Sequence, residues 1–162
     1  MVELTAFVRE AVLPGGPGTI PRLDSRFCHF RLRYGPSPIH RWGIFSEEAI
    51  PARRRVIRYT GQRINAREAW RRRFRQHLYL FWLSNRFAID GMIGGSGAEF
   101  INHSCVPNLR ARVARGRIVL VSLRPIAAGE ELTLDYHLSG DWPEIPCLCG
   151  AAACRGRLQR SG

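Results

Sequence analysis

The amino-acid sequence predicts a mainly β domain with short helices. Short segments rich in β-branched and aromatic residues recur along the chain, separated by glycine, proline or asparagine. Only one segment carries a clear helix-start signal, and strands do not alternate with helices, which excludes a doubly wound, Rossmann-type domain. At 162 residues the chain is long enough for one domain with a real apolar core.

The chain begins with a segment typical of a loose arm. Residues 1–24 mix a few apolar residues with the run Pro14-Gly-Gly-Pro-Gly18. Over residues 27–34 apolar residues alternate with arginines, which predicts a half-buried strand that ends at Gly35. Further short strands are expected at 44–45, 56–59, 79–83, 87–89, 109–114, 117–122 and 132–136.

One helix and one hairpin have the strongest local signals. Asn65 is a helix N-cap residue with Glu68 three positions on, and an arginine-rich helical run follows to about Gln76. Gly116 separates the strands expected at 109–114 and 117–122, which predicts a β-hairpin.

Composition limits the class of protein. The net charge is +12, and all 25 basic residues are arginine, which excludes lysine-based catalysis. No apolar run approaches the roughly 20 residues that span a bilayer. Glu3, Arg9 and Glu10 make a poor secretory signal, so we expect no membrane association and an intracellular place, cytoplasmic or nucleoid-associated. Five cysteines, three of them within eight residues, favour a metal site in a reducing compartment over disulfides.

Arginine density is highest between Arg53 and Arg75, with Trp70 and Phe74 among the arginines. Such a patch can follow a phosphate backbone, which leaves nucleic acid as a candidate partner. The alternative interpretation is a solvated helix face, and it is slightly favoured because no known nucleic-acid-binding motif accompanies the patch.

Three motifs occur in a fixed order. They are an Asn-His-Ser-Cys run within 99–108, an acidic segment ending in Asp-Tyr over 131–136, and a C-x-C-x4-C tail over 147–154. Together they resemble the SET-domain protein lysine methyltransferases with a cysteine-rich post-SET tail. The resemblance covers about residues 27–158.

The resemblance implies a fold and an activity. The fold would be a SET domain over residues 25–141, built of small curled sheets with a threaded C-terminal segment, and a post-SET tail over 142–162. The residues before it, 1–24, would be an N-terminal arm. The activity would be methyl transfer from S-adenosylmethionine to a lysine side chain of a protein, by a chain expected to be monomeric. Since this chain has no lysine, it could not methylate its own side chains, although codon bias also explains the missing lysines.

The family's catalytic tyrosine corresponds to Tyr136, and Tyr79 matches a second tyrosine that lines the lysine channel. The tyrosine hydroxyl orients the substrate amine without acting as a general base. Leu134 corresponds to a position beside the same channel that is often phenylalanine or tyrosine. A leucine there leaves room for a methylated amine to turn, which predicts di- or trimethyl-lysine unless Phe81 or Trp82 fills the space.

The resemblance assigns the cofactor to two segments and the start of the tail. These cofactor-binding residues are Arg41, Trp42, Gly43, Asn102, His103 and Leu148. Arg41 replaces the first glycine of a usual Gly-x-Gly, which puts the geometry of this loop in doubt but could provide a cation for the methionine carboxylate. Ser96, Glu99 and Gln62 are further departures from the family pattern.

Tetrahedral zinc binds four ligands, and the tail supplies three cysteines, Cys147, Cys149 and Cys154. The resemblance implies that Cys105 of the Asn-His-Ser-Cys run is the fourth, which would tie the tail to the active site. His137 is the alternative fourth ligand. Cys28, in an alternating segment, is expected to be a buried apolar residue.

Three functions remain open from the sequence. The chain is an active protein-lysine methyltransferase, an inactive SET-like module that binds a protein or nucleic acid through its arginines, or a small zinc-stabilised structural protein. The substrate is a protein that presents a lysine, with histone-like, nucleoid and ribosomal proteins as candidates. A chain of charge +12 repels a basic substrate at long range, so acidic residues at the site or an acidic context of the target are expected.

Overall fold

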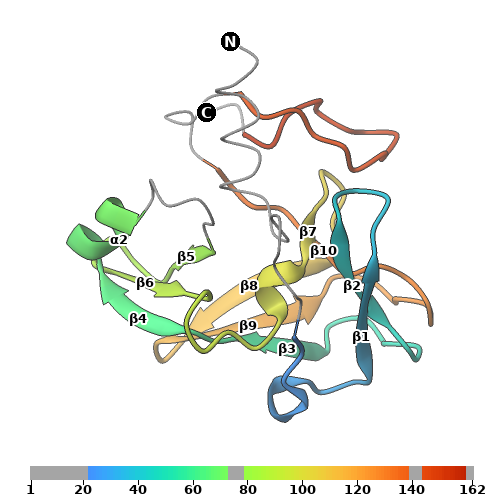
Figure 1. Ribbon diagram of the computed structural model, residues 1–162. Helices are drawn as coiled ribbons and strands as arrows, with labels where there is room; N and C mark the ends of the chain where they lie inside the picture. Colours follow the sequence, from blue (N-terminus) through green and yellow to red (C-terminus); the bar gives the residue numbers. More distant parts are fainter. Residues whose placement is uncertain (1–21, 73–78, 139–143, 160–162) are drawn as a thin grey trace.

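The computed structural model describes residues 22–72, 79–138 and 144–159 (Figure 1). Its strands are β1 (Leu32–Pro36), β2 (Trp42–Ser46), β3 (Arg55–Tyr59), β4 (Gln62–Asn65), β5 (Leu80–Trp82), β6 (Phe87–Asp90), β7 (Asn102–His103), β8 (Leu109–Ala114), β9 (Arg117–Ser122) and β10 (Thr133–Leu134). The helical elements are α2 (Ala66–Arg72) and two short 3-10 turns, η1 (Ser25–Phe27) and η2 (Ala98–Phe100). The predicted mainly β fold with short helices is confirmed.

The strands form three small sheets. The largest has the order β3-β9-β8-β10-β7, and β1-β2 and β4-β6-β5 are the other two. Figure 1 shows the β1-β2 pair and the β4-β6-β5 sheet at opposite sides of the large sheet. The main core is formed mostly by branched aliphatic side chains, and Ile57, Ile118 and Leu120 in the large sheet are completely buried.

β10 lies between two strands that a short loop connects. It pairs in parallel with β7 on one side and with β8 on the other, and residues 104–108 join those two strands. Leu134 in β10 is therefore opposite both His103 and Leu109. The chain that follows β10 thus passes beside the 104–108 loop, which is the threaded arrangement that the sequence resemblance implied.

The helix begins where the capping signal predicts. The Glu68 N–H donates a hydrogen bond to Asn65 Oδ1 at 2.9 Å, which satisfies one of the free donors of the first turn. Arg72 in the last turn is buried and contacts Glu68 Oε1 and Asp90 Oδ2, each at 2.7 Å. These contacts fix α2 to β6. The predicted continuation to Gln76 lies outside the described residues.

The strand predicted over residues 27–34 is wrong in its first half. The Asp24 side chain accepts the Arg26 N–H, and this cap favours the turn η1. Only Cys28 bridges to Ile57 before β1 begins at Leu32. The sequence analysis also missed β4 and the two-residue strand β7, since a polar tetrapeptide and an isolated pair carry little alternation.

The hairpin of β8 and β9 has the predicted bounds and turns at Gly116, whose φ is 69°. Next to η1, Asp24 donates its N–H to Ser96 O and Leu23 packs against the main core. The boundary of the N-terminal arm at residue 24 remains a prediction, and Pro14–Gly18 lie outside the described residues. Among the helices in the described ranges, none has the length and apolar character needed to cross a membrane.

Candidate functional site

Asn102 joins the loop before β2 to the centre of the molecule. Its side chain is buried, and Nδ2 lies 2.8 Å from Trp42 O and 2.8 Å from Glu131 Oε1. Ser37 Oγ, which donates to the same carboxylate at 2.8 Å, is 3.0 Å from Nδ2. Asn102 thus joins Trp42, another residue of the predicted cofactor site, to the acidic segment before β10.

Gly43 lies against the Glu131 carboxylate. A β-carbon at this position would push that carboxylate from its contacts with Ser37 and Asn102, so glycine suits the close approach of β2 to Glu131. Arg41, two residues earlier, has a φ of 41°, in the left-handed region that non-glycine residues rarely adopt. The family glycine that Arg41 replaces would adopt this conformation without strain.

His103, the second residue of β7, lies between Tyr136 and Cys105. Its Nδ1 accepts the Tyr136 backbone N–H at 3.2 Å, so the proton of the neutral ring is on Nε2, which is 3.5 Å from Cys105 Sγ. Burial lowers the pKa of His103 to about 4, against the opposing effect of Asp135. The neutral imidazole therefore connects the backbone of Tyr136 to a cysteine of the predicted metal site.

The predicted catalytic tyrosines lie in one aromatic region. Tyr136 Oη donates to Ile101 O at 2.8 Å, and burial, with Tyr79 and Glu131 nearby, raises its pKa well above the usual value. Tyr79 is buried, with its ring centroid 5.8 Å from that of Phe100. Because the hydroxyl of Tyr136 stays protonated, it can donate or accept a hydrogen bond but cannot take a proton as a phenolate base.

Tyr59 is a residue of this region that the sequence analysis did not assign to the site. Its Oη donates to Tyr79 O at 2.6 Å, and its ring is 5.4 Å from that of Phe81. Burial raises its pKa well above the usual value. A tyrosine at a strand end is a common core residue, so the sequence carried no signal for this contact. The sequence analysis also missed Ser37 and Arg155, because no motif indicated their contacts with Glu131 and Asp135.

The other predicted residues divide between the inside and the surface. Leu134 is buried in β10 beside His103, and Phe81 packs half-buried against the main core. Leu148 is 45% exposed on the tail between two cysteines. The roles in catalysis and cofactor binding assigned to all these residues remain predictions.

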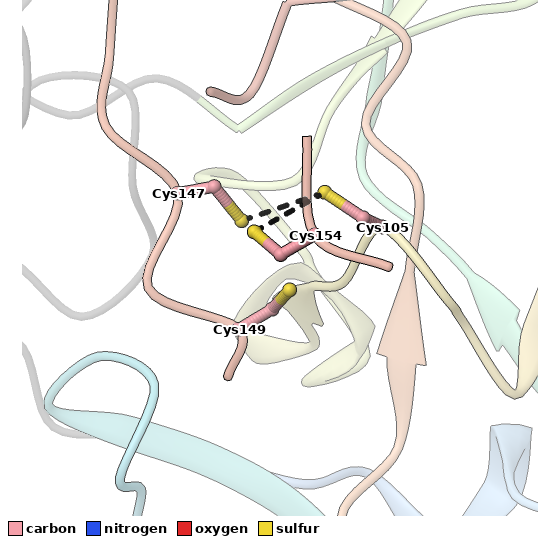
Figure 2. A group of neighbouring side chains, drawn as sticks. All are labelled: Cys105, Cys147, Cys149 and Cys154. Atoms are coloured by element: carbon pink, nitrogen blue, oxygen red, sulfur yellow. Dashed lines mark hydrogen bonds between the residues drawn. The ribbon is translucent and has the colours of Figure 1, made fainter. Parts of the chain in front are cut away.

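Four cysteines converge at the start of the tail (Figure 2). The sulfur atoms of Cys105, Cys147, Cys149 and Cys154 all lie within 4.8 Å of one another. Cys105 Sγ is 3.7 Å from Cys147 Sγ and 3.8 Å from Cys154 Sγ. Two sulfurs bound to one zinc ion at about 2.3 Å and tetrahedral angles are about 3.8 Å apart, so these distances fit a zinc site made of four thiolates.

The chemistry of the four thiols also fits a bound cation. Burial raises the pKa values of Cys105 and Cys147, whereas hydrogen bonds from the backbone of Cys105 and Ala151 and from neighbouring thiols outweigh burial and lower that of Cys149 to about 6. Four adjacent thiolates without a cation repel one another, and a zinc ion removes that repulsion and deprotonates its ligands. Cys28 is not part of this group, and its Sγ donates to Asp24 O.

The tail packs onto Tyr136. Ile145 and Leu158 are buried in a small apolar cluster that includes Tyr136. Arg155 donates to Asp135 Oδ1 at 2.9 Å, and its backbone N–H donates to Cys105 Sγ at 3.4 Å. The guanidinium of Arg155 lowers the pKa of Asp135 despite burial. Tail, metal site and Tyr136 therefore form one contact network.

Comparison with known proteins agrees with this geometry. The family model described as SET domain matches residues 41–137. The histone-lysine N-methyltransferase, H3 lysine-4 specific, of Schizosaccharomyces pombe is 42% identical over 96% of this chain and 18% of its own length. Human histone-lysine N-methyltransferase SETD1A is 41% identical over 82% of this chain and 8% of its own length. The histone-lysine N-methyltransferase, H3 lysine-4 specific, of Aspergillus fumigatus is 35% identical over 98% of this chain and 14% of its own length.

The same fold occurs among solved structures. The crystal structure of KRYPTONITE in complex with mCHG DNA and SAH superposes with a TM-score of 0.69 at 31% identity. The match covers 81% of this chain and 29% of that chain. The chain thus spans less than a third of each of these proteins.

Proposed function

The chain belongs to the SET domain family, and from this premise we propose that it transfers a methyl group from S-adenosylmethionine to a lysine of a histone. The observation that carries the proposal is the single network of Tyr136, His103 and the four cysteines. The names of the relatives, H3 lysine-4 specific among them, make the N-terminal tail of histone H3 the first substrate to test. A chromatin location follows from that substrate, as part of the same proposal.

In the proposed reaction the neutral lysine amine attacks the methyl group in line. The N–C bond forms as the S–C bond breaks, the bonding electron pair stays on sulfur, and the amine proton leaves to solvent. Such a displacement depends mainly on alignment. The Tyr136 hydroxyl, protonated because of its raised pKa, is suited to orient the amine by a hydrogen bond. The SAH in the KRYPTONITE structure is what the donor becomes after transfer, which supports this chemistry.

Contacts on the chain support distinct proposed tasks for the remaining residues. The buried amide of Asn102, with Trp42 O and Glu131, would hold the cofactor loop in place. Tyr79 and Phe81 would line the lysine channel with Tyr59 behind them. Leu134 has no hydroxyl that could retain a water beside the amine, which supports di- or trimethyl-lysine as product.

A zinc ion, when bound, would supply a structural cross-link and no step of the transfer. Cys105, Cys147, Cys149 and Cys154 would hold it, and the neutral Nε2–H of His103 would donate to the Cys105 thiolate. Since His103 Nδ1 also accepts the Tyr136 N–H, an ordered metal site positions the tyrosine backbone.

The test measures methylation of an H3 tail peptide with labelled S-adenosylmethionine, using a peptide with lysine 4 replaced by arginine as specificity control. Tyr136→Phe should lower kcat at least tenfold, since the hydroxyl acts in the transition state, while the Kd of S-adenosylmethionine stays within about twofold. Tyr34→Phe, at an exposed tyrosine outside the network, is the matched control. An unchanged kcat for Tyr136→Phe would remove the catalytic assignment, and a wild type without turnover on any histone would favour the inactive binding module.

A further inference from the structure

The outer face of the large sheet carries five arginines and no acidic residue. In β3, β9 and β8, paired residues share a face. Arg58, Val119 and Arg112 are paired in one row across the sheet, and Arg55, Val121 and Arg110 in the next. Arg117 follows on the same face of β9, two residues before Val119. The opposite face, with Ile57, Ile118 and Leu120, belongs to the main core, and on the first side Val121 is buried as well. We call the first side the arginine face.

Carboxylates pair with several arginines elsewhere on the molecule, but with none of the arginine face among the described residues. Ion pairs join arginines to acidic residues at η1, at α2 and in the tail, for example Arg26 to Asp24, Arg72 to Asp90 and Arg155 to Asp135. Within the described ranges, none of the arginines of the arginine face makes such a pair. Four of them are exposed, namely Arg55, Arg110, Arg112 and Arg117.

Strand geometry spaces these charges regularly on β8 and β9, whereas a register shift between Arg55 and Ile57 interrupts the spacing on β3. Strands two apart in a sheet are separated by about 10 Å, and alternate residues along a strand by about 7 Å. The latter distance equals the axial rise of about two nucleotides in duplex DNA. Arg58 extends the array toward Phe27, since its guanidinium lies 5.7 Å from the ring centroid. Its Nε is buried without a hydrogen-bond partner in the described part of the chain.

We infer that the arginine face binds the phosphate backbone of duplex DNA. Guanidiniums that have no carboxylate partner among the described residues suit repeated phosphate groups, and the three strands offer no carboxylate that would repel them. The face lies on the side of the large sheet away from the core, so its contacts do not involve Tyr136 or the cysteine cluster. The choice of DNA over other polyanions rests on the proposed histone substrate, because histone tails are presented beside DNA. Attraction to DNA would also offset the repulsion between a +12 chain and a basic tail.

The arginine face therefore differs from the arginine patch that the sequence indicated between Arg53 and Arg75. On α2, Arg71 and Arg72 are paired with Glu68, and Arg72 is buried, so this part is not a uniformly solvated helix face. Only Arg55 and Arg58 of that stretch belong to the arginine face. The hairpin of β8 and β9 supplies the rest, and residues 73–75 lie outside the described ranges.

The test compares two double variants of the full, zinc-loaded chain that lose the same charge. Arg110→Gln with Arg112→Gln alters the arginine face. Arg67→Gln with Arg86→Gln alters exposed arginines of α2 and of the turn before β6, which make no ion pair with a carboxylate of the described residues either. Binding of a labelled DNA duplex of about two helical turns is measured by fluorescence anisotropy at several salt concentrations, without S-adenosylmethionine. Thermal unfolding and zinc content check that both variants fold.

The face variant should lose roughly tenfold in affinity, and the slope of log K against log salt should fall by about 2, since each phosphate contact contributes about 0.9. The control should stay within about twofold. Equal losses in both variants, or no binding by the wild type at about 50 mM salt, would overturn the inference. Equally tight binding of a matched RNA duplex would overturn the choice of DNA. Methylation of the free H3 peptide by the face variant should be unchanged, because the face is separate from the site. This measurement distinguishes a failure of the DNA-binding inference from a failure of the proposed methyltransferase activity.

Discussion

The large sheet and the cysteine-rich tail meet at β10, and different forces hold them. β3, β9 and β8 are held by ladder hydrogen bonds and by a continuous core that includes Ile57, Ile118 and Leu120. The tail, described over residues 144–159, has only two buried apolar residues in that range, Ile145 and Leu158. Its other contacts are thiols, the Arg155 ion pair and a few backbone hydrogen bonds. Because this segment buries so little apolar surface, we expect a metal bound by its cysteines to contribute much of its order.

This difference means that stability and activity can be separated by mutation. The sheet should determine the free energy of unfolding, whereas the tail should determine whether Tyr136 is correctly placed. The contact that links them is narrow, because β10 has two residues and His103 is the residue between Cys105 and the Tyr136 backbone.

Cys154→Ser should have the largest effect on activity. Zinc content should fall from one per chain to little or none, and methylation of the H3 peptide should fall at least about 100-fold, since three thiolates and a hydroxyl bind zinc much more weakly than four thiolates. Circular dichroism in the far ultraviolet should change little, because the sheet does not depend on the tail. Metal analysis and the peptide assay check this.

Cys28→Ser is the matched control for that variant. Cys28 Sγ contacts Asp24 O and lies outside the four-cysteine group, so zinc content and activity should remain near wild type. Full zinc retention by Cys154→Ser would contradict the four-cysteine site. Testing Cys105→Ser next would then show whether the fourth ligand comes from elsewhere, with His137 as the alternative.

Leu120→Ala should lower the stability of the fold and leave zinc binding unchanged. Leu120 is completely buried in β9, and truncation of such a residue costs about 2–5 kcal/mol of unfolding free energy. Zinc content at a temperature where the variant is folded should stay at one per chain. Chemical denaturation measures the loss. Leu123→Ala, at a position 44% exposed, should cost less than about 1 kcal/mol. A loss of zinc in Leu120→Ala below its unfolding midpoint would refute the separation of the two regions.

The sheet was largely predictable from the sequence, and the site was predictable only through its motifs. The alternation of apolar residues and arginines over 109–114, the apolar run over 118–121 and the turn at Gly116 define the hairpin of β8 and β9. β7 is the opposite case. Two buried polar residues, Asn102 and His103, have no strand signal, and they pair only because β10 lies beside them.

Long-range polar contacts account for the parts of the site that the sequence pattern did not predict. The resemblance implied that Cys105 joins the tail cysteines, and the structure brings these sulfurs together across 42 residues. No motif indicated that Ser37 would reach Glu131 or that Arg155 would reach Asp135. Such contacts depend on the tertiary arrangement of loops. The arginine face likewise needs the strand register, because Arg58 and Arg112 are far apart in sequence.

Glu99, a largely buried carboxyl in η2, should make the stability of the protein depend on pH. Burial raises its pKa to about 7 from 4.5, although the Gly97 N–H donates to its carboxylate at 2.9 Å. Between these values the native state holds one proton more than the unfolded state, so stability falls as pH rises from 4.5 to about 7. Glu99→Gln should remove this loss and stabilise the protein at about pH 8 by up to about 3 kcal/mol.

Urea unfolding of wild type and Glu99→Gln at about pH 5 and about pH 8 measures the effect. The difference between the two proteins should be clearly larger at the higher pH. Glu144→Gln, at a side chain 72% exposed, should leave the pH dependence as it is. A Glu99→Gln variant whose gain is the same at both pH values would show that the carboxyl is not held protonated by burial.

The smallest expected effect concerns Arg41, whose backbone is strained just before β2. Its φ of 41° is easier for glycine, so Arg41→Gly should stabilise the fold by about 0.5–1 kcal/mol after allowing for the greater chain entropy of glycine. Arg53→Gly is the matched control, because Arg53 is exposed with a φ of 61° in a turn remote from β7. If Arg41 gives its charge to the carboxylate of S-adenosylmethionine, only Arg41→Gly should weaken cofactor binding, by several-fold, when both variants are measured by calorimetry. Equal cofactor affinity in the two variants would mean that the charge of Arg41 has no role in binding the carboxylate of S-adenosylmethionine.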